Sequence, residues 1–196
     1  EEADLGRQPP APHGGSAGGM SGSDPCGVRV IPRLDIKGPN VVKGVQAEGL
    51  RVVGAPAELA KKYYEAGADE LIYMDIVASL YGRNLDLELL RSVANQIFIP
   101  LTVGGGIRSV HDIENTIHAG ADKVAINTAA LRRPTLLAES VARFGAQCIV
   151  LSVEAKQVGA GAWEAYTDGG RERTKRYALL WVDEALALVF TGLFRG

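Results

Sequence analysis

The stretch Ala66-Gly-Ala-Asp-Glu-Leu-Ile-Tyr-Met-Asp75 decides the fold, because its pattern recurs along the 196-residue chain. The same order, a glycine and then a short apolar run, returns at 119–126 and at 145–151. Each glycine follows a segment whose apolar residues lie three and four positions apart, which predicts a helix that ends at the glycine. The repeating unit is therefore a helix, a glycine and a strand.

Short, continuous apolar strands separated by helices are typical of parallel sheets that are buried on both faces. We expect an α/β protein with strands near 29–35, 70–75, 98–103, 123–127 and 147–154, and helices near 56–66, 86–95, 108–118, 134–144 and 176–190. A closed eight-fold barrel needs ~250 residues, or ~31 for each βα unit, so the foldable part of this chain has room for about five units. We therefore expect no complete barrel within one copy of the chain.

The composition predicts an ordinary globular protein, with 46% hydrophobic and 22% charged residues. The formal net charge of −2 offers no electrostatic basis for binding nucleic acid or an anionic membrane surface. The two cysteines, Cys26 and Cys148, lie far apart, and neither a disulfide framework nor a zinc pattern follows from them or from the three histidines. We expect neither a metal nor a cofactor. We also expect a cytoplasmic protein, because no charged segment followed by a short apolar stretch stands at the start of this sequence, which argues against secretion.

Polar residues follow the predicted strands, at the edge of the sheet where parallel α/β folds bind ligands. Asp35 closes the first strand and Glu154 closes the fifth, and in a closed barrel these two strands lie opposite one another. Two carboxylates across a pocket can act as general acid and general base if their environments separate their pKa values. The alternative is that each pairs with a nearby cation, Arg33 for Asp35 and Lys156 for Glu154.

A run of three glycines, Gly104 to Gly106, joins a predicted strand to a predicted helix. Glycines let backbone N–H groups approach an anion, and the start of a helix adds positive potential, so phosphate is the expected ligand. The alternative is a tight turn that needs glycine only for its positive φ. Asn127 and Thr128 end the next strand and favour phosphate, because they add amide and hydroxyl donors beside the loop.

Charged residues also stand where strands begin, at the opposite edge of the sheet: Asp69, Glu70, Asp122 and Lys123. In barrel folds this edge usually contributes to stability rather than to chemistry. Taken alone, these residues predict a structural role.

Eight segments carry the motifs of a known family: Ile31-Pro-Arg-Leu-Asp-Ile-Lys37, Val41-Val-Lys-Gly44, Asp69-Glu-Leu71, Asp75-Ile76, Leu101-Thr-Val-Gly-Gly-Gly-Ile107, Gly120-Ala-Asp-Lys-Val124, Ile126-Asn-Thr-Ala129 and 147–156. Together they closely resemble the cyclase subunit of imidazole glycerol phosphate synthase. The resemblance implies a TIM (β/α)8 barrel, here shortened to about five βα units. It also implies a lyase reaction of histidine biosynthesis. In that reaction, ammonia from a glutaminase subunit converts a phosphoribulosyl-formimino aminoimidazole carboxamide ribotide to imidazole glycerol phosphate and aminoimidazole carboxamide ribotide.

The resemblance also assigns roles to particular residues. Asp35 and Glu154 take the places of the two catalytic aspartates, and Lys43 matches the lysine of the first loop. The residues that correspond to a phosphate site are Gly105, Gly106, Asn127 and Thr128.

The resemblance also implies a functional role for the charged residues at the strand starts, which composition and position alone assign to stability. The residues that match three of the four members of an ammonia gate are Arg29, Glu70 and Lys123. Asp122 and Gln147 lie on the family's face for the glutaminase, the expected partner in a heterodimer.

Some residues depart from the family. Glu154 replaces an aspartate, and Arg33 and residues 37–40 are similar to a divergent branch found beside surface-polysaccharide genes. Ammonia-dependent synthesis of an acetamidino sugar is therefore an alternative function, and an inactive half-barrel is another.

We expect three parts in the chain. Residues 1–27, with seven glycines and four prolines, predict a disordered N-terminal extension. Residues 28–174 form the partial barrel, and 175–196 form a C-terminal tail without family resemblance. Within this tail Asp183 and Glu184 interrupt an apolar run, which favours a partly exposed helix over a membrane span.

Overall fold

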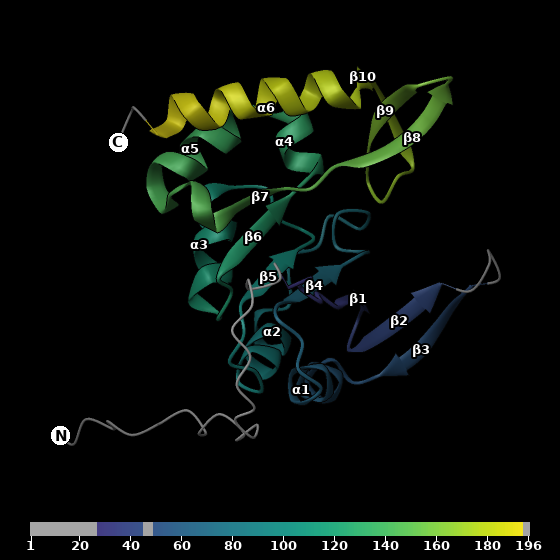
Figure 1. The fold of residues 1–196 in the computed structure, drawn as a ribbon, viewed down its shortest axis with the longest axis vertical. Coiled ribbons are helices and arrows are strands. Elements are labelled where there is room, and N and C mark those ends of the chain that lie inside the picture. The colour runs from purple at the N-terminus through teal and green to yellow at the C-terminus, as the bar shows by residue number, and fades with distance from the viewer. Residues whose placement is uncertain (1–26, 45–48, 194–196) are drawn as a thin grey trace, which may run out of the picture.

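A computed structural model describes residues 27–44 and 49–193, and its largest sheet has the order β3-β2-β1-β4-β5-β6-β7 (Figure 1). The strands of this sheet are β1 (Arg33–Lys37), β2 (Asn40–Gly44), β3 (Leu50–Gly54), β4 (Leu71–Asp75), β5 (Leu101–Gly104), β6 (Lys123–Ile126) and β7 (Ile149–Leu151). β1 and β4 to β7 run parallel, whereas β2 and β3 form an antiparallel extension of β1. The five parallel strands confirm the expected α/β class. The described sheet is open, with β3 and β7 at its edges.

Helices connect the parallel strands, as the repeat predicts. They are α1 (Pro56–Glu65), α2 (Leu87–Ala94), α3 (Val110–His118), α4 (Thr128–Arg132) and α5 (Thr135–Phe144). A sixth helix, α6 (Ala178–Leu193), follows the last strand of the described residues. The side chains of Asp86 and Ser109 accept hydrogen bonds from backbone N–H groups in the first turns of α2 and α3, which explains where these helices begin. The sequence did not predict the short helix α4, which starts directly after β6.

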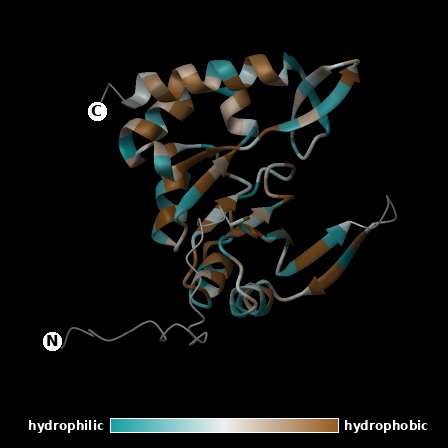
Figure 2. Cartoon of the chain, in the orientation of Figure 1, coloured by the Kyte–Doolittle hydropathy of each residue, from teal (hydrophilic) through white to brown (hydrophobic). Residues whose placement is uncertain are grey.

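Two hydrophobic clusters form the core. Leu34, Leu71 and Leu101 point from their strands toward α1 and α2 and are buried. The second cluster contains Ile126 of β6, Leu136 of α5 and further residues of α3 and α6. Figure 2 shows hydrophobic residues on the central strands and along much of α6. Each fully buried leucine or isoleucine contributes about 1.5–3 kcal/mol to folding.

Three predicted strands were placed wrongly. The strand predicted near 98–103 begins only at Leu101, as β5. The first strand begins at Arg33 rather than at residue 29. The preceding segment lies beside β4 but makes only isolated hydrogen bonds with its neighbours. The carbonyls of Val30 and Pro32 accept one hydrogen bond each, from the N–H groups of Asp69 and Ile72. The predicted strand 147–154 is divided into a 3-10 turn, η1 (Ala146–Cys148), then β7, and then the start of another sheet.

That second sheet is antiparallel and has the order β10-β9-β8. It contains β8 (Glu154–Gly159), β9 (Ala162–Thr167) and β10 (Glu172–Tyr177). Residues 160–161 connect β8 to β9, and the two strands pair as an antiparallel hairpin.

The expected C-terminal helix is present as α6, which packs against α5 and β9. Its residues Ala178, Trp181 and Ala185 are buried, whereas Leu179, Leu180, Leu186 and Phe190 are exposed. Among the described residues, no helix combines the length and the apolar character that a membrane span requires. The prediction of a disordered extension concerns residues that lie almost wholly outside those described.

Candidate functional site

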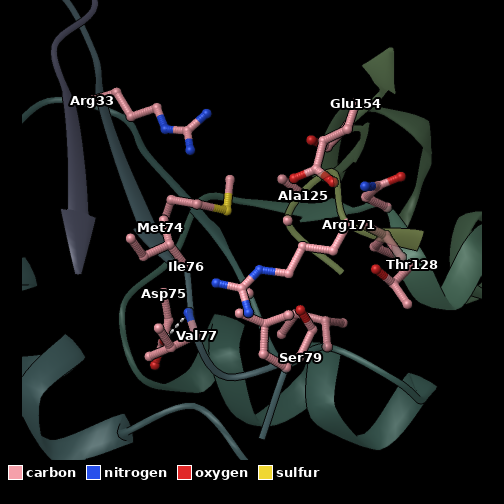
Figure 3. A pocket seen from close by; sticks show the side chains of 18 of the residues that line it. Arg33, Met74, Asp75, Ile76, Val77, Ser79, Ala125, Thr128, Glu154 and Arg171 are labelled. Atoms are coloured by element: carbon pink, nitrogen blue, oxygen red, sulfur yellow. Dashed lines mark hydrogen bonds between the residues drawn. The ribbon is translucent and has the colours of Figure 1, made fainter. Parts of the chain in front are cut away.

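A cavity of about 400 Å³ lies at the carboxyl ends of the parallel strands (Figure 3). Of the predicted site residues, it is lined by Gly105, Gly106, Asn127, Thr128 and Glu154. These residues lie together because each follows a parallel strand, and the carboxyl ends of parallel strands meet at one edge of the sheet. The predicted phosphate residues and one predicted catalytic carboxylate therefore share one cavity.

Asp35 lies on β1 beside this cavity rather than among its lining residues. The Arg33 Nε donates a hydrogen bond to the Asp35 Oδ1 at 2.6 Å, and Arg33 itself lines the cavity. Both side chains are more than one third exposed, whereas Leu34 and Ile36, which alternate with them on β1, are buried. The ion pair that the sequence offered as an alternative role for Asp35 is thus formed.

Glu154 begins β8 and has a different partner from the one expected. Its Oε2 accepts a hydrogen bond from the backbone N–H of Gly170 at 2.8 Å. Lys156, the alternative partner, instead places its Nζ 4.7 Å from the centre of the Tyr166 ring. Figure 3 shows Glu154 and Arg33 on opposite sides of the cavity.

The glycine loop packs tightly against the neighbouring strand end. Gly105 and Gly106 have φ values of +96° and +73°, and a Cβ at Gly105 would lie 2.1 Å from the carbonyl oxygen of Asp75. This packing alone requires glycine at both positions. Phosphate binding by the loop stays a prediction.

Asn127 contacts β9, and Thr128 contacts the turn between β9 and β10. The Asn127 Nδ2 donates to the carbonyl of Tyr166 at 3.2 Å, and the Thr128 hydroxyl accepts from the N–H of Asp168 at 3.0 Å. A hydroxyl that accepts a bond keeps its own proton to donate. The Asn127 Oδ1 is buried without a hydrogen-bond partner among the described residues.

Lys43 is not brought to the cavity. It lies on β2, is exposed, and pairs across the ladder with Arg51 of β3. Figure 1 shows this hairpin extending away from the parallel strands. Nothing in the described contacts links Lys43 to the other predicted site residues.

Asp75 and Arg171 also line the cavity, although neither was predicted as a catalytic or binding residue. The buried Asp75 ends β4, and its Oδ1 accepts from the N–H groups of Val77 and Ala78 at 3.0 and 2.8 Å. The position of Asp75 directly after the apolar run of β4 is a sequence pattern that indicates a place at the cavity. Arg171 follows a turn in the second sheet, and no sequence pattern indicates that this turn reaches the cavity. Among residues 27–44 and 49–193, no cluster of acidic, histidine or cysteine side chains could hold a metal.

The predicted gate residues meet at the amino-terminal ends of the strands. Glu70 is buried and forms ion pairs with Arg29 and with Lys123, whose Nζ lies 2.8 Å from the Glu70 Oε2. The hydrogen bond from Lys123 lowers the pKa of the Glu70 carboxyl below its ordinary value of 4.5, against the opposing effect of burial. The structure therefore brings together the three residues that the sequence grouped.

The two predicted interface residues lie on this same end. Asp122 is tied to β5 through its Oδ2, which accepts from the N–H of Leu101 at 2.8 Å. It lines a groove of about 330 Å³ next to Phe98, whose side chain is 60% exposed. Gln147 is exposed on η1.

Comparison with known proteins gives a consistent result. The profile of the family described as "Histidine biosynthesis protein" matches residues 29–193. The chain is 61% identical over 154 residues to "Imidazole glycerol phosphate synthase subunit HisF" of Legionella pneumophila, covering 79% of this chain and 73% of that protein. Proteins of the same name from Streptococcus sanguinis and Streptococcus gordonii are 51% and 50% identical over 160 residues, which cover 82% of this chain and 64% of theirs.

The chain thus spans less than two thirds of the length of the two streptococcal relatives. The family profile includes α6, whereas we expected family resemblance only as far as Thr174. The three-part division of the chain stays a prediction.

Proposed function

Because the chain belongs to the histidine biosynthesis protein family, with imidazole glycerol phosphate synthase cyclase subunits as its relatives, we propose that it is a lyase of this type. It uses ammonia to convert a phosphoribulosyl-formimino aminoimidazole carboxamide ribotide to imidazole glycerol phosphate and aminoimidazole carboxamide ribotide. The observation that carries this proposal is the 61% identity over 154 residues to a protein of that name.

The reaction needs proton transfers, and Asp35 and Glu154 are the groups proposed to perform them. General acid and base catalysis contributes about 10²–10⁴-fold to a rate. The Arg33 Nε donates a hydrogen bond to the Asp35 Oδ1, which orients this carboxyl group beside the cavity. Glu154 lines the cavity directly, and only one of its oxygens is engaged by a backbone N–H group.

The substrate's phosphate is proposed to bind at the Gly105-Gly106 loop and at Thr128. The Thr128 hydroxyl has a proton to donate, and the Asn127 amide lies beside it. Lys43, which matches the lysine of the family's first loop, is proposed to assist the reaction; in this structure it lies on β2, outside the cavity wall.

The ammonia is proposed to come from a glutaminase subunit bound at the amino-terminal ends of the strands. The Arg29, Glu70 and Lys123 side chains form a closed ionic contact there, and Asp122 and Gln147 lie on the surrounding surface. A neutral molecule such as ammonia can pass such a contact without removing a charge from its partner.

The test is turnover of the nucleotide substrate by the purified chain with an ammonium salt, with the product identified by mass spectrometry. Asp35→Asn and Glu154→Gln should each lower kcat by about 100-fold or more. Glu58→Gln, on the exposed surface of α1, is the control and should retain wild-type turnover.

The same samples separate the alternatives. Arg33 is one of the residues that match the surface-polysaccharide branch, and it lies in the cavity wall. A sugar precursor is therefore assayed in parallel with the nucleotide substrate. Ammonia-dependent turnover of the sugar alone would refute the histidine-pathway assignment, and turnover of neither compound would favour the inactive half-barrel.

A further inference from the structure

The turn between β9 and β10 reaches back to the cavity and is held there at several points. The N–H of Asp168 donates to the Thr128 hydroxyl at 3.0 Å, and the Asp168 carboxylate forms an ion pair with Arg132 of α4 at 2.7 Å. The N–H of Gly170 donates to Glu154 at 2.8 Å. The turn is therefore anchored both to α4 and to the first residue of β8.

The backbone of this turn has an unusual conformation. Asp168, Gly169 and Gly170 have φ values of +54°, +70° and +74°, and a left-handed conformation is rare for a residue other than glycine. The N–H of Arg171 then donates to the carbonyl of Thr167 at 3.1 Å and closes the turn. These contacts determine where the backbone of Arg171 lies.

The side chain of Arg171 points into the cavity. Figure 3 shows its guanidinium group directed toward the side of the cavity that holds Val77 and Ser79, across from Glu154. The Arg171 guanidinium forms no ion pair with a carboxylate of the described residues, whereas the other cavity arginine, Arg33, is paired with Asp35. Of the two arginines in the cavity wall, Arg171 is thus the one whose positive charge no carboxylate of the described residues neutralises.

The carboxylates of the cavity wall do not compensate this charge, because both have other partners. Asp75 accepts from two backbone N–H groups and lies 3.5 Å from Arg83. Glu154 accepts from Gly170. The nearby Thr128 hydroxyl and the glycine loop can supply donors to the same ligand.

We propose that Arg171 binds a phosphate group of the substrate in this cavity, a role that deepens the proposed function and rests on it. A guanidinium presents a planar fork of N–H donors that matches two oxygens of a phosphate, and it stays charged at every working pH. The hydrogen-bonded turn holds the Arg171 guanidinium at the cavity, so binding a phosphate requires no rearrangement of the backbone.

The test measures the affinity of the full chain for inorganic phosphate by isothermal titration calorimetry. Arg171→Gln should weaken phosphate binding about tenfold or more, which corresponds to one lost charged contact. Arg171→Lys keeps the charge but loses the fork, so its affinity should lie between those of Arg171→Gln and the wild type. Arg91→Gln, at the exposed surface of α2, removes the same charge and should leave the affinity within twofold of the wild type.

Two results would overturn the proposal: Arg171→Gln and Arg91→Gln with the same affinity, or a wild-type chain that does not bind phosphate. Turnover is measured on the same samples to separate this proposal from the proposed function. If the wild type turns over the nucleotide and Arg171→Gln changes neither KM nor phosphate affinity, only the role of Arg171 is refuted. If phosphate affinity depends on Arg171 but no nucleotide is turned over, only the proposed reaction is refuted.

Discussion

Glu70 is the residue whose charge state most directly affects stability. Its side chain is 10% exposed and accepts hydrogen bonds from both Lys123 and Arg29. Glu70→Gln removes the negative charge and should lower the free energy of unfolding by about 1–3 kcal/mol near neutral pH, as measured by urea denaturation. Glu65→Gln, which loses an exposed contact to Lys61 at 3.9 Å, should cost less than about 0.5 kcal/mol.

The pH dependence of this effect follows from the direction of the pKa shift. The pKa of Glu70 is lower in the folded chain than its ordinary value of 4.5, so the ionic contact stabilises the fold above pH 4.5. This contribution is lost as the pH falls from 4.5 through the folded pKa. The difference in unfolding free energy between the wild type and Glu70→Gln should therefore shrink on acidification. A difference that grows on acidification would contradict this account.

The helix α6 is the element whose packing the sequence left most open. Trp181 has only 1% of its surface exposed and lies in the cluster that contains Leu136 and Ile126. Trp181→Ala should destabilise the fold by about 3–5 kcal/mol, because it leaves a large cavity between α6 and α5. The measurement is urea denaturation followed by circular dichroism.

Leu180 is the matched control for Trp181, because it is the preceding residue on α6 and is 64% exposed. Leu180→Ala should change the unfolding free energy by less than about 0.5 kcal/mol. If both substitutions have this small effect, α6 contributes nothing to the core, and the described packing is wrong.

At the scale of the whole molecule, the two hydrophobic clusters are joined through the ladder between β5 and β6, where Val103 pairs with Val124. The strands around this ladder are buried, whereas nearly all residues of β3 and β8 are at least one third exposed. Hydrogen exchange followed by mass spectrometry should find the slowest amides in β4 to β6 and the fastest in β3 and β8. Exchange in β8 as slow as in β5 would refute this order.

Local patterns were sufficient to predict many of the elements. The apolar spacing before each glycine predicted α1, α3 and α5. The sequence also placed α2, and the boundaries of all four helices lie within two residues of their predicted places. The start of β1 was harder to predict, because residues 29–32 are apolar enough for a strand but find only isolated hydrogen bonds beside β4. The division of 147–154 into two strands depends on β9, a partner that lies outside the segment itself.

The sequence by itself determined the alternation of helices and strands, the parallel sheet and the placement of Glu154 and Thr128 near one edge, because these follow from periodicity and from chain direction. The sequence also offered the Arg33–Asp35 ion pair, but only the tertiary structure decided the partners of the other charged groups at the cavity. Glu154 accepts a hydrogen bond from Gly170 rather than pairing with Lys156. Lys43 lies outside the cavity wall, whereas Arg171 is part of it. The physical reason is that a side-chain contact depends on how distant segments pack, and the second sheet folds back over β6 and α4 through contacts that no local pattern contains.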